Sequence, residues 1–377
     1  MNRSRVFSAA LIVAAAAWNL VPAPSRAQEP SNFTIMAKGL EGPRGLKFGP
    51  DGALYIAEAG TGGTVSTVGK CTQVVPPVGP YKGGSSGRIS KLQLGKLSTV
   101  ASGFASTEDA MGDLIGVADV AFVGPTLYAL VAGGGCSHGH TGLASGIAKV
   151  SLGNGFWTLI ADVGSWLKTH PTRYESPDDF EPDGTLYSLI SLNGVLYTIE
   201  PNHGQLISVT PNGVISQVID ISASEGHIVP TSVAARFGNF YVGNLNLFPI
   251  DPQWARVLTI SPTTDDNPAP GFSLGTGWHI VNSKAGFTTV VAVTFGPDGL
   301  LYALELSDLA GFPAPGNGKV VRVLSNGNLE EVITGLNVPT GMTFGPDGAL
   351  YISDFGAAPA PAIGVGRILR FVISAGS

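Results

Sequence analysis

Acidic and amide side chains recur at one position of a repeated pattern in this sequence. Six tyrosines follow short apolar runs, and five of the six residues that stand three positions after them carry side-chain oxygens: Glu58, Glu200, Asn244, Glu305 and Asp354. The sixth of these residues is Val131. Oxygen ligands of this kind suit a divalent cation if they meet around one axis. Polar side chains at strand ends also frequently bond the adjacent turn, so a purely architectural role is the competing interpretation.

The tyrosines belong to a repeated hairpin. The run Phe-Gly-Pro-Asp-Gly-Ala-Leu-Tyr-Ile occurs at residues 48–56 and again at 344–352, and residues 295–302 depart from it only at the sixth position. Proline presets φ at the second turn position and glycine closes the turn. The apolar runs on either side of each turn therefore predict two antiparallel strands.

Six such units follow one another, and their reference tyrosines are Tyr55, Tyr128, Tyr197, Tyr241, Tyr302 and Tyr351. Third strands are expected at 88–92, 147–150, 205–209, 256–260, 319–323 and 367–371, and most units add an outer strand. Four antiparallel strands repeated six times predict an all-β, six-bladed β-propeller. The last unit lacks a fourth strand, and residues 33–40 parallel the segment before the last hairpin. We therefore expect the N-terminal strand to close the last blade.

Composition agrees with one domain of this kind. A chain of 377 residues suggests two domains by length alone, but the repeats run almost end to end, so residues 28–377 are expected to form a single propeller. The 52 glycines and 27 prolines make up about a fifth of the chain, as a protein of many strands and turns requires. A net charge of −6 without a Lys/Arg patch argues against nucleic-acid binding. We expect a monomer.

The N-terminus has the pattern of a signal peptide. Arg3 and Arg5 precede an apolar run from 6 to 20, and Ser25-Arg26-Ala27 supplies small residues at a cleavage site. Residues 1–27 are therefore predicted to be removed. No later segment reaches the length of a membrane span, so we expect no membrane insertion after cleavage. The predicted location is secreted or periplasmic.

The chain has two cysteines, Cys71 and Cys136, both expected in loops between second and third strands of adjacent blades. In an exported protein a disulfide between them is favoured over two free loop cysteines. Cys136, His138 and His140 are three potential zinc ligands in one loop. Because no second cluster completes a zinc site, a solvated glycine loop is the preferred interpretation.

Long insertions are expected on one face, at 59–87, 132–146, 161–184 and 306–318, which is typical of a binding face. The loop at 261–277 is expected on the opposite face, and we assign it no role. Four further residues head inner strands and should rim the same opening: Arg44, Tyr187, Thr231 and Thr340. Together with Glu58, Glu200, Asn244, Glu305 and Asp354, they form the predicted ligand-binding set at the channel mouth.

Residues 39–60, GLEGPRGLKFGPDGALYIAEAG, and residues 300–305, LLYALE, resemble the ScyD/ScyE family of exported propellers with NHL-like repeats. The resemblance implies the fold and export, and it implies no catalytic residues. Glu41-Gly42-Pro43 is also similar to the opening motif of gluconolactonase-type propellers, whose divalent metal is held by Glu, Asn and Asp. Here Thr231-Ser232 stands where the Asn is expected. Streptogramin-lyase-like propellers are similar in shape, but their histidine-centred site has no clear match.

The favoured function is an exported propeller that binds a small molecule or a protein on its long-loop face, with no assignable catalysis. The alternative is a metal-dependent hydrolase, such as a lactonase, or a lyase that uses channel carboxylates and a divalent cation. A quinone-dependent dehydrogenase ranks third, because the sequence offers no convincing basic and histidine pocket. The residue pattern alone does not decide whether the protein is an enzyme.

Overall fold

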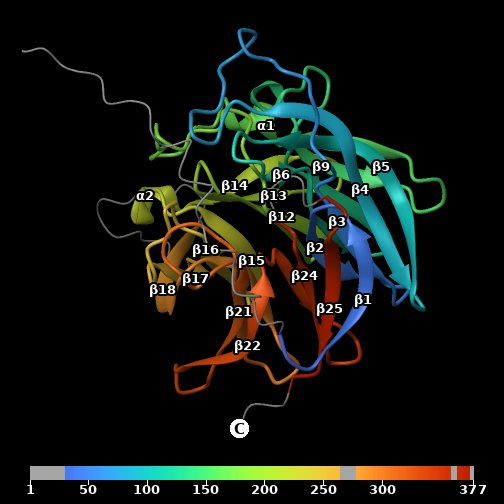
Figure 1. Ribbon diagram of the computed structural model, residues 1–377. Helices are drawn as coiled ribbons and strands as arrows, with labels where there is room; N and C mark the ends of the chain where they lie inside the picture. The colour runs from blue at the N-terminus through green and yellow to red at the C-terminus, as the bar shows by residue number, and fades with distance from the viewer. Residues whose placement is uncertain (1–29, 264–276, 358–362, 374–377) are drawn as a thin grey trace, which may run out of the picture.

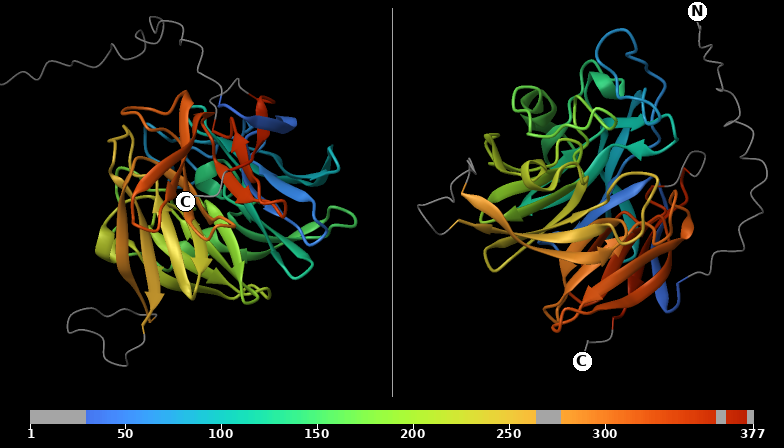
Figure 2. Two further views of the ribbon diagram at one scale, coloured as in Figure 1. Left: turned by 90° about the horizontal axis from the view of Figure 1, so that it is seen from below. Right: turned by 90° about the vertical axis from the view of Figure 1, so that its left-hand side faces the viewer.

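The computed structural model describes residues 30–263, 277–357 and 363–373. The predicted signal peptide at 1–27 and most of the 261–277 loop lie outside the described residues. Within these ranges the chain forms six antiparallel sheets, which surround one axis (Figures 1 and 2). The predicted six-bladed β-propeller is therefore confirmed.

The first three blades follow in chain order, each from an inner to an outer strand. The first blade contains β2 (Pro43–Phe48), β3 (Leu54–Glu58), β4 (Lys82–Gln93), β5 (Lys96–Glu108) and the short β6 (Leu114–Ile115). The second contains β7 (Val117–Val123), β8 (Thr126–Val131), β9 (Gly146–Val150) and β10 (Trp157–Asp162). The third contains β11 (Ser188–Leu192), β12 (Val195–Glu200), β13 (Gln205–Val209) and β14 (Ile215–Asp220).

The remaining blades complete the ring. The fourth contains β15 (Pro230–Arg236), β16 (Asn239–Asn244), β17 (Ala255–Pro262) and β18 (Trp278–Phe287). The fifth contains β19 (Val290–Phe295), β20 (Leu301–Glu305), β21 (Pro315–Val323) and β22 (Leu329–Asn337). The sixth contains β23 (Gly341–Phe344), β24 (Leu350–Asp354), β25 (Gly366–Phe371) and β1 (Phe33–Leu40).

The strand β1 closes the ring as predicted. It pairs antiparallel with β25, with Phe33 opposite Phe371 and Leu40 opposite Gly366. The blue β1 accordingly lies beside the red β25 in Figure 1. Because the first and last parts of the chain share one sheet, the backbone groups of β25 are paired on both sides.

The aspartate of the repeated turn organises the hairpin. The Asp51 carboxylate accepts hydrogen bonds from the Ala53 N–H at 3.1 Å and the Tyr55 hydroxyl at 3.0 Å, and Lys91 of β4 lies 2.7 Å from it. Asp298 and Asp347 accept from the tyrosine hydroxyl of their own hairpins in the same way. A Cβ on Gly49 would lie 2.6 Å from the Tyr55 ring, so only glycine fits there.

Aromatic contacts join neighbouring blades. The second-strand tyrosine of one blade packs edge-on against the first-strand phenylalanine of the next, at ring-centroid distances of 4.9–5.0 Å, in the pairs Tyr55–Phe122, Tyr241–Phe295, Tyr302–Phe344 and Tyr351–Phe48. The last of these pairs joins the sixth blade to the first. The repeated Phe and Tyr therefore contribute to the core between blades as well as to the hairpin.

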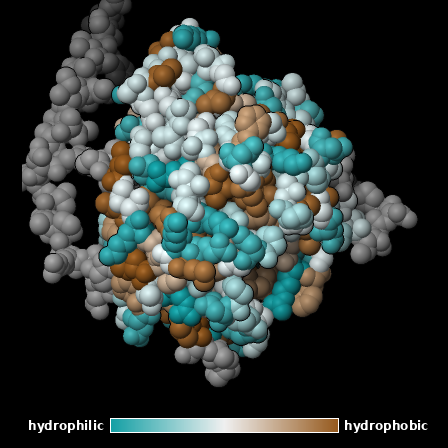
Figure 3. Space-filling model, turned by 90° about the vertical axis from the view of Figure 1, so that its right-hand side faces the viewer, coloured by the Kyte–Doolittle hydropathy of each residue, from teal (hydrophilic) through white to brown (hydrophobic). Residues whose placement is uncertain are grey.

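Long loops gather on one face of the ring, at the top of Figure 1. The predicted disulfide lies there and is confirmed, with the Cα atoms of Cys71 and Cys136 6.3 Å apart. Two short helices also occur, α1 (Val163–Leu167) and α2 (Ser222–Glu225), together with the 3₁₀ turn η2 (Cys136–His138). None of the helices among the described residues is long and apolar enough to cross a membrane. On the side shown in Figure 3, hydrophilic and hydrophobic side chains are interspersed.

Candidate functional site at the channel mouth

Glu58, the first member of the predicted acidic ring, is fully buried and bonds within its own blade. It forms a two-point ion pair with Arg88 of β4, with Nε and Nη2 at 2.9 and 2.6 Å. It also accepts from the Ser90 hydroxyl and, at 2.8 Å, from the Glu41 N–H in the loop that enters the blade. Every one of these contacts ties the end of β3 to its neighbours in sequence or sheet.

Glu200 has the equivalent position in the third blade. It accepts from the Thr185 N–H at 3.0 Å and from the backbone and ring nitrogens of His203 at 2.6 and 2.9 Å. Burial by itself would raise the pKa of Glu200, but the charge and hydrogen bonds of His203 bring it below its ordinary value. The same pairing raises the pKa of His203 against the opposing effect of burial.

Asp354 and Glu305 repeat the arrangement. Asp354 accepts from the Asn337 N–H at 2.6 Å and from Arg367 Nε at 2.8 Å. Glu305 accepts from the Thr288 N–H at 2.8 Å. Burial raises the pKa of both carboxyls, although hydrogen bonds and nearby cations oppose it. In each case the backbone donor lies just before the first strand of the same blade, or at the blade connection.

Asn244, the equivalent residue of the fourth blade, also bonds backbone groups, through its side-chain amide. Its Nδ2 donates to the Ile228 carbonyl at 2.9 Å, and its Oδ1 accepts from the Arg256 N–H at 2.8 Å. None of the five ring residues lines either of the two cavities described below. Residues 30–263, 277–357 and 363–373 contain no group of three or more His, Cys, Asp or Glu that could hold a metal ion. The structure places these side chains in separate blades and does not bring them together.

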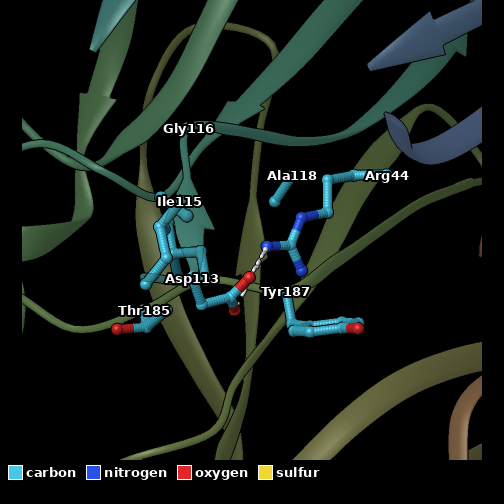
Figure 4. A pocket seen from close by; sticks show the side chains of 9 residues that line it. Arg44, Asp113, Ile115, Gly116, Ala118, Thr185 and Tyr187 are labelled. Atoms are coloured by element: carbon cyan, nitrogen blue, oxygen red, sulfur yellow. Dashed lines mark hydrogen bonds and ion pairs between the residues drawn. The ribbon is translucent and has the colours of Figure 1, made fainter. Parts of the chain in front are cut away.

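Two of the predicted rim residues do meet. Arg44, at the start of β2, and Tyr187, just before β11, line a cavity of about 80 Å³ at the channel mouth (Figure 4). Arg44 Nη2 donates to both oxygens of Asp113, at 3.2 and 3.3 Å, and to the Leu114 carbonyl. The other walls come from five small or apolar residues and one threonine: Ile115, Gly116, Ala118, Ala132, Leu186 and Thr185.

The electrostatics of this mouth cavity keep its polar groups in defined states. Burial by itself lowers the pKa of the Arg44 guanidinium, but the Asp113 carboxylate and the Tyr187 phenol hold it above its ordinary value. Burial raises the pKa of Tyr187 to about 12, so the phenol is neutral at physiological pH. The cavity therefore presents a permanent cation that is paired with the Asp113 carboxylate, and a neutral phenol, beside apolar walls.

The other two predicted rim residues, Thr231 and Thr340, donate hydrogen bonds to backbone carbonyls. Thr231 donates to the Val290 carbonyl at 2.5 Å, and Thr340 donates to the Pro43 carbonyl at 2.6 Å. Thr340 and Tyr187 also line a second cavity of only about 30 Å³, which takes residues from the inner strands of all six blades. Such a volume holds about one water molecule, whose share of liquid volume is roughly 30 Å³, so little free space remains between these inner strands.

A buried polar cluster behind the mouth cavity was not predicted. Glu181 accepts from the Tyr81 hydroxyl at 3.0 Å and from the Thr185 hydroxyl, and it lies 3.1 Å from His138 Nε2. Ser137 donates to Asp183 through its N–H and its hydroxyl, at 2.7 and 2.6 Å. The turn around His138 is therefore buried, and the expectation of a solvated glycine loop was wrong. Its glycines allow the close backbone packing that buries it.

Asp109 lies in the turn that carries Asp113. Its carboxylate accepts from the N–H groups of Met111 and Asp113 at 2.8 and 2.7 Å. Burial and the neighbouring Asp113 charge raise its pKa to about 7, against the effect of these hydrogen bonds. The sequence marks this pair only as two aspartates in a connection between blades, which is a weak signal.

Comparisons with known proteins support the fold. No protein-family model and no curated protein matches the chain. The structure is similar to an oxidoreductase (glucose dehydrogenase) from Thermus thermophilus, with 17% identity, a TM-score of 0.56, and coverage of 90% of this chain and 99% of that one. It is also similar to the calcium-binding protein regucalcin from Agrobacterium tumefaciens, with 12% identity, a TM-score of 0.55, and coverage of 93% and 96%.

A third similar structure is the PQQ-bound aldose sugar dehydrogenase from Streptomyces coelicolor, with 12% identity, a TM-score of 0.50, and coverage of 92% of this chain and 98% of that one. At these identities the likeness establishes the propeller architecture. It extends over nearly the whole length of the neighbouring chains, which agrees with one complete ring of blades.

Proposed function

We propose that this chain is an exported propeller of the ScyD/ScyE type that binds a small organic acid in the mouth cavity. The observation that carries the proposal is the buried Arg44 guanidinium at a cavity whose other walls are mainly apolar. Asp113 and Leu114 both accept from Nη2, whereas the other terminal nitrogen lies on the Tyr187 side of the guanidinium in Figure 4 and would donate to a bound carboxylate.

The size of the cavity sets the class of ligand. At roughly 30 Å³ for each water-sized group in a liquid, the cavity of about 80 Å³ takes about two or three such groups. A carboxylate with one or two further carbons fills this space, and a longer hydroxylated chain would extend through the open mouth. The Tyr187 phenol would bond a ligand hydroxyl, and Ile115 and Leu186 would contact its carbon atoms.

A binding experiment with three probes tests this proposal. We expect L-lactate and D-gluconate to bind the mature protein, residues 28–377, in isothermal titration calorimetry, and neutral D-glucose to fail. The sugar chemistry named for two fold neighbours guides the choice of probes. Arg44→Gln should raise the Kd of both acids about tenfold or more, because it removes a charge-assisted hydrogen bond between the protein and the ligand carboxylate.

The control is Arg370→Gln, which removes a cation paired with Asp347 at a Pro-Asp-Gly turn, away from the cavity. It should leave binding unchanged. If Arg44→Gln lowers the melting temperature, Tyr187→Phe provides a milder test through the loss of one hydroxyl. The proposal would be contradicted if neither Arg44→Gln nor Tyr187→Phe changed the Kd for the two acids. It would also be contradicted if glucose bound as tightly as gluconate.

Export is part of the proposal and has its own test. Cleavage after Ala27 should give an exported chain whose intact mass begins at Gln28. A mass that retains Met1 would contradict it. The metal-dependent hydrolase alternative requires acidic or amide oxygens that are open to a cation, but those of Glu58, Asn244 and Asp354 accept hydrogen bonds within their own blades or from the adjoining blade connection. Divalent metal retained in stoichiometric amount through dialysis would restore that alternative.

A further inference from the structure

One loop contacts both walls of the mouth cavity. Residues 59–81, which join β3 to β4 and are called the strap below, run along the long-loop face from the first blade. The strap is attached to the second blade by the disulfide between Cys71 and Cys136. Both cysteines are half-buried, so the bridge is not enclosed in the core.

The first wall is the turn that holds Asp113. The Val78 carbonyl of the strap accepts a hydrogen bond from the Ala110 N–H at 2.8 Å. Ala110 lies within the turn from Asp109 to Asp113, which is closed by the Asp109 N–H to the Asp113 carbonyl at 3.0 Å. The strap therefore helps to position the turn whose Asp113 carboxylate pairs with Arg44.

The second wall is the segment 181–187. Tyr81, at the end of the strap, donates to Glu181, which in turn accepts from Thr185 of the cavity lining. The disulfide reaches this segment by another route as well. Cys136 is followed by Ser137, which donates twice to Asp183. The strap and η2 thus hold the same wall from two sides.

The ring itself does not need the disulfide for closure. The pairing of β1 with β25 joins the ends of the chain, and the bridge links two loops outside the blades. Its breakage should therefore loosen the loops before the blades.

We propose that the Cys71–Cys136 disulfide is a thiol-sensitive latch on the mouth cavity, closed when oxidised and loosened when reduced. A dithiol would attack one sulfur, form a mixed disulfide and then leave as its own cyclic disulfide. Cys71 and Cys136 gain two electrons and two protons, and the dithiol loses them. The strap is then held by non-covalent contacts alone, and the walls that carry Asp113 and Thr185 open more often. This regulation rests on the proposed function of the same cavity.

Hydrogen exchange measured by mass spectrometry tests the latch without any ligand. In the mature protein, dithiothreitol should raise exchange about fivefold or more in peptides covering 109–116 and 181–187, and leave the β19–β20 hairpin unchanged. The double variant Cys71→Ser/Cys136→Ser should show the loosened pattern with or without dithiothreitol, which separates the bridge from other effects of the reagent.

Calorimetry with D-gluconate adds the functional readout, with an expected increase in Kd of about tenfold on reduction. Equal exchange in the two walls before and after reduction would overturn the latch. A uniform increase in all six blades would also overturn it, because the bridge would then be a general staple. If oxidised protein binds neither gluconate nor lactate, the proposed function fails alone, and the exchange data still decide the latch.

Discussion

At the scale of single residues, the acidic positions stabilise blades. Glu58 is buried beneath Arg88, and the side chain of Arg88 is 26% exposed. Glu58→Gln would leave the partly exposed Arg88 guanidinium facing a buried amide in place of a carboxylate, so we expect a loss of about 3 kcal/mol in the free energy of unfolding. Urea denaturation measures it. The proposed ligand site predicts unchanged lactate binding in this variant.

A matched surface variant calibrates that loss. Glu331 forms an ion pair of 2.7 Å with Lys319, but its side chain is 55% exposed. Glu331→Gln should change stability by less than about 1 kcal/mol, as exposed pairs do. If the two variants lose the same amount, the burial of Glu58 does not have the energetic role assigned to it. If Glu58→Gln abolishes lactate binding without loss of stability, the ring belongs to the site after all.

Asp109 predicts a pH dependence of stability. Its pKa rises from 3.8 to about 7 in the folded state, so the folded chain keeps a proton that the unfolded chain releases. Stability from this group therefore falls as the pH rises from about 4 to about 7. Asp109→Asn retains an oxygen that accepts from Met111 and Asp113, and it removes the charge beside Asp113.

The difference in stability between Asp109→Asn and the natural chain should therefore grow across this pH range and become constant above it. Denaturation curves at several pH values measure the difference. A difference that stays constant from pH 4 to pH 8 would show that Asp109 titrates normally. The titratable groups that interact with Asp109 are Asp113 and Tyr81. Both residues are present in the variant and in the natural chain, so the comparison isolates the Asp109 carboxyl.

At the scale of elements, β1 is the strand on which closure depends. Deletion of residues 33–38 would expose the backbone of β25 and remove the contact of Phe33 with Phe371, at a centroid distance of 6.0 Å. We expect the melting temperature to fall by about 10 °C or more, together with a loss of solubility. Differential scanning calorimetry measures the effect.

A chain that begins at Asn32 is the control for this deletion, because it shortens the N-terminus and keeps β1. It should melt like the mature protein. Equal melting of the two truncated chains would mean that the sixth blade is stable with three strands. The pairing of β1 with β25 would then be dispensable for stability.

At the scale of the whole molecule, similar blades form an unequal face. The turns between the first and second strands are short in every blade, whereas the loops over the first three blades are long, and a disulfide joins those of the first two. The mouth cavity lies beneath these loops and takes its residues from the same three blades. The mouth cavity therefore lies against the first three blades and is not repeated around the ring by the same residues.

The sequence by itself determined the hairpins, the six blades, the closure by residues 33–40 and the pairing of Cys71 with Cys136. These features depend on turn chemistry and on a regular repeat, which are local and visible in the order of residues. The tertiary structure decided how each polar group is used. Arg44 and Asp113 are 69 positions apart, and nothing in their local sequence indicates that they meet. Glu58 and Arg44 are both polar residues at strand ends, and only packing decides which bonds its own blade and which faces a cavity.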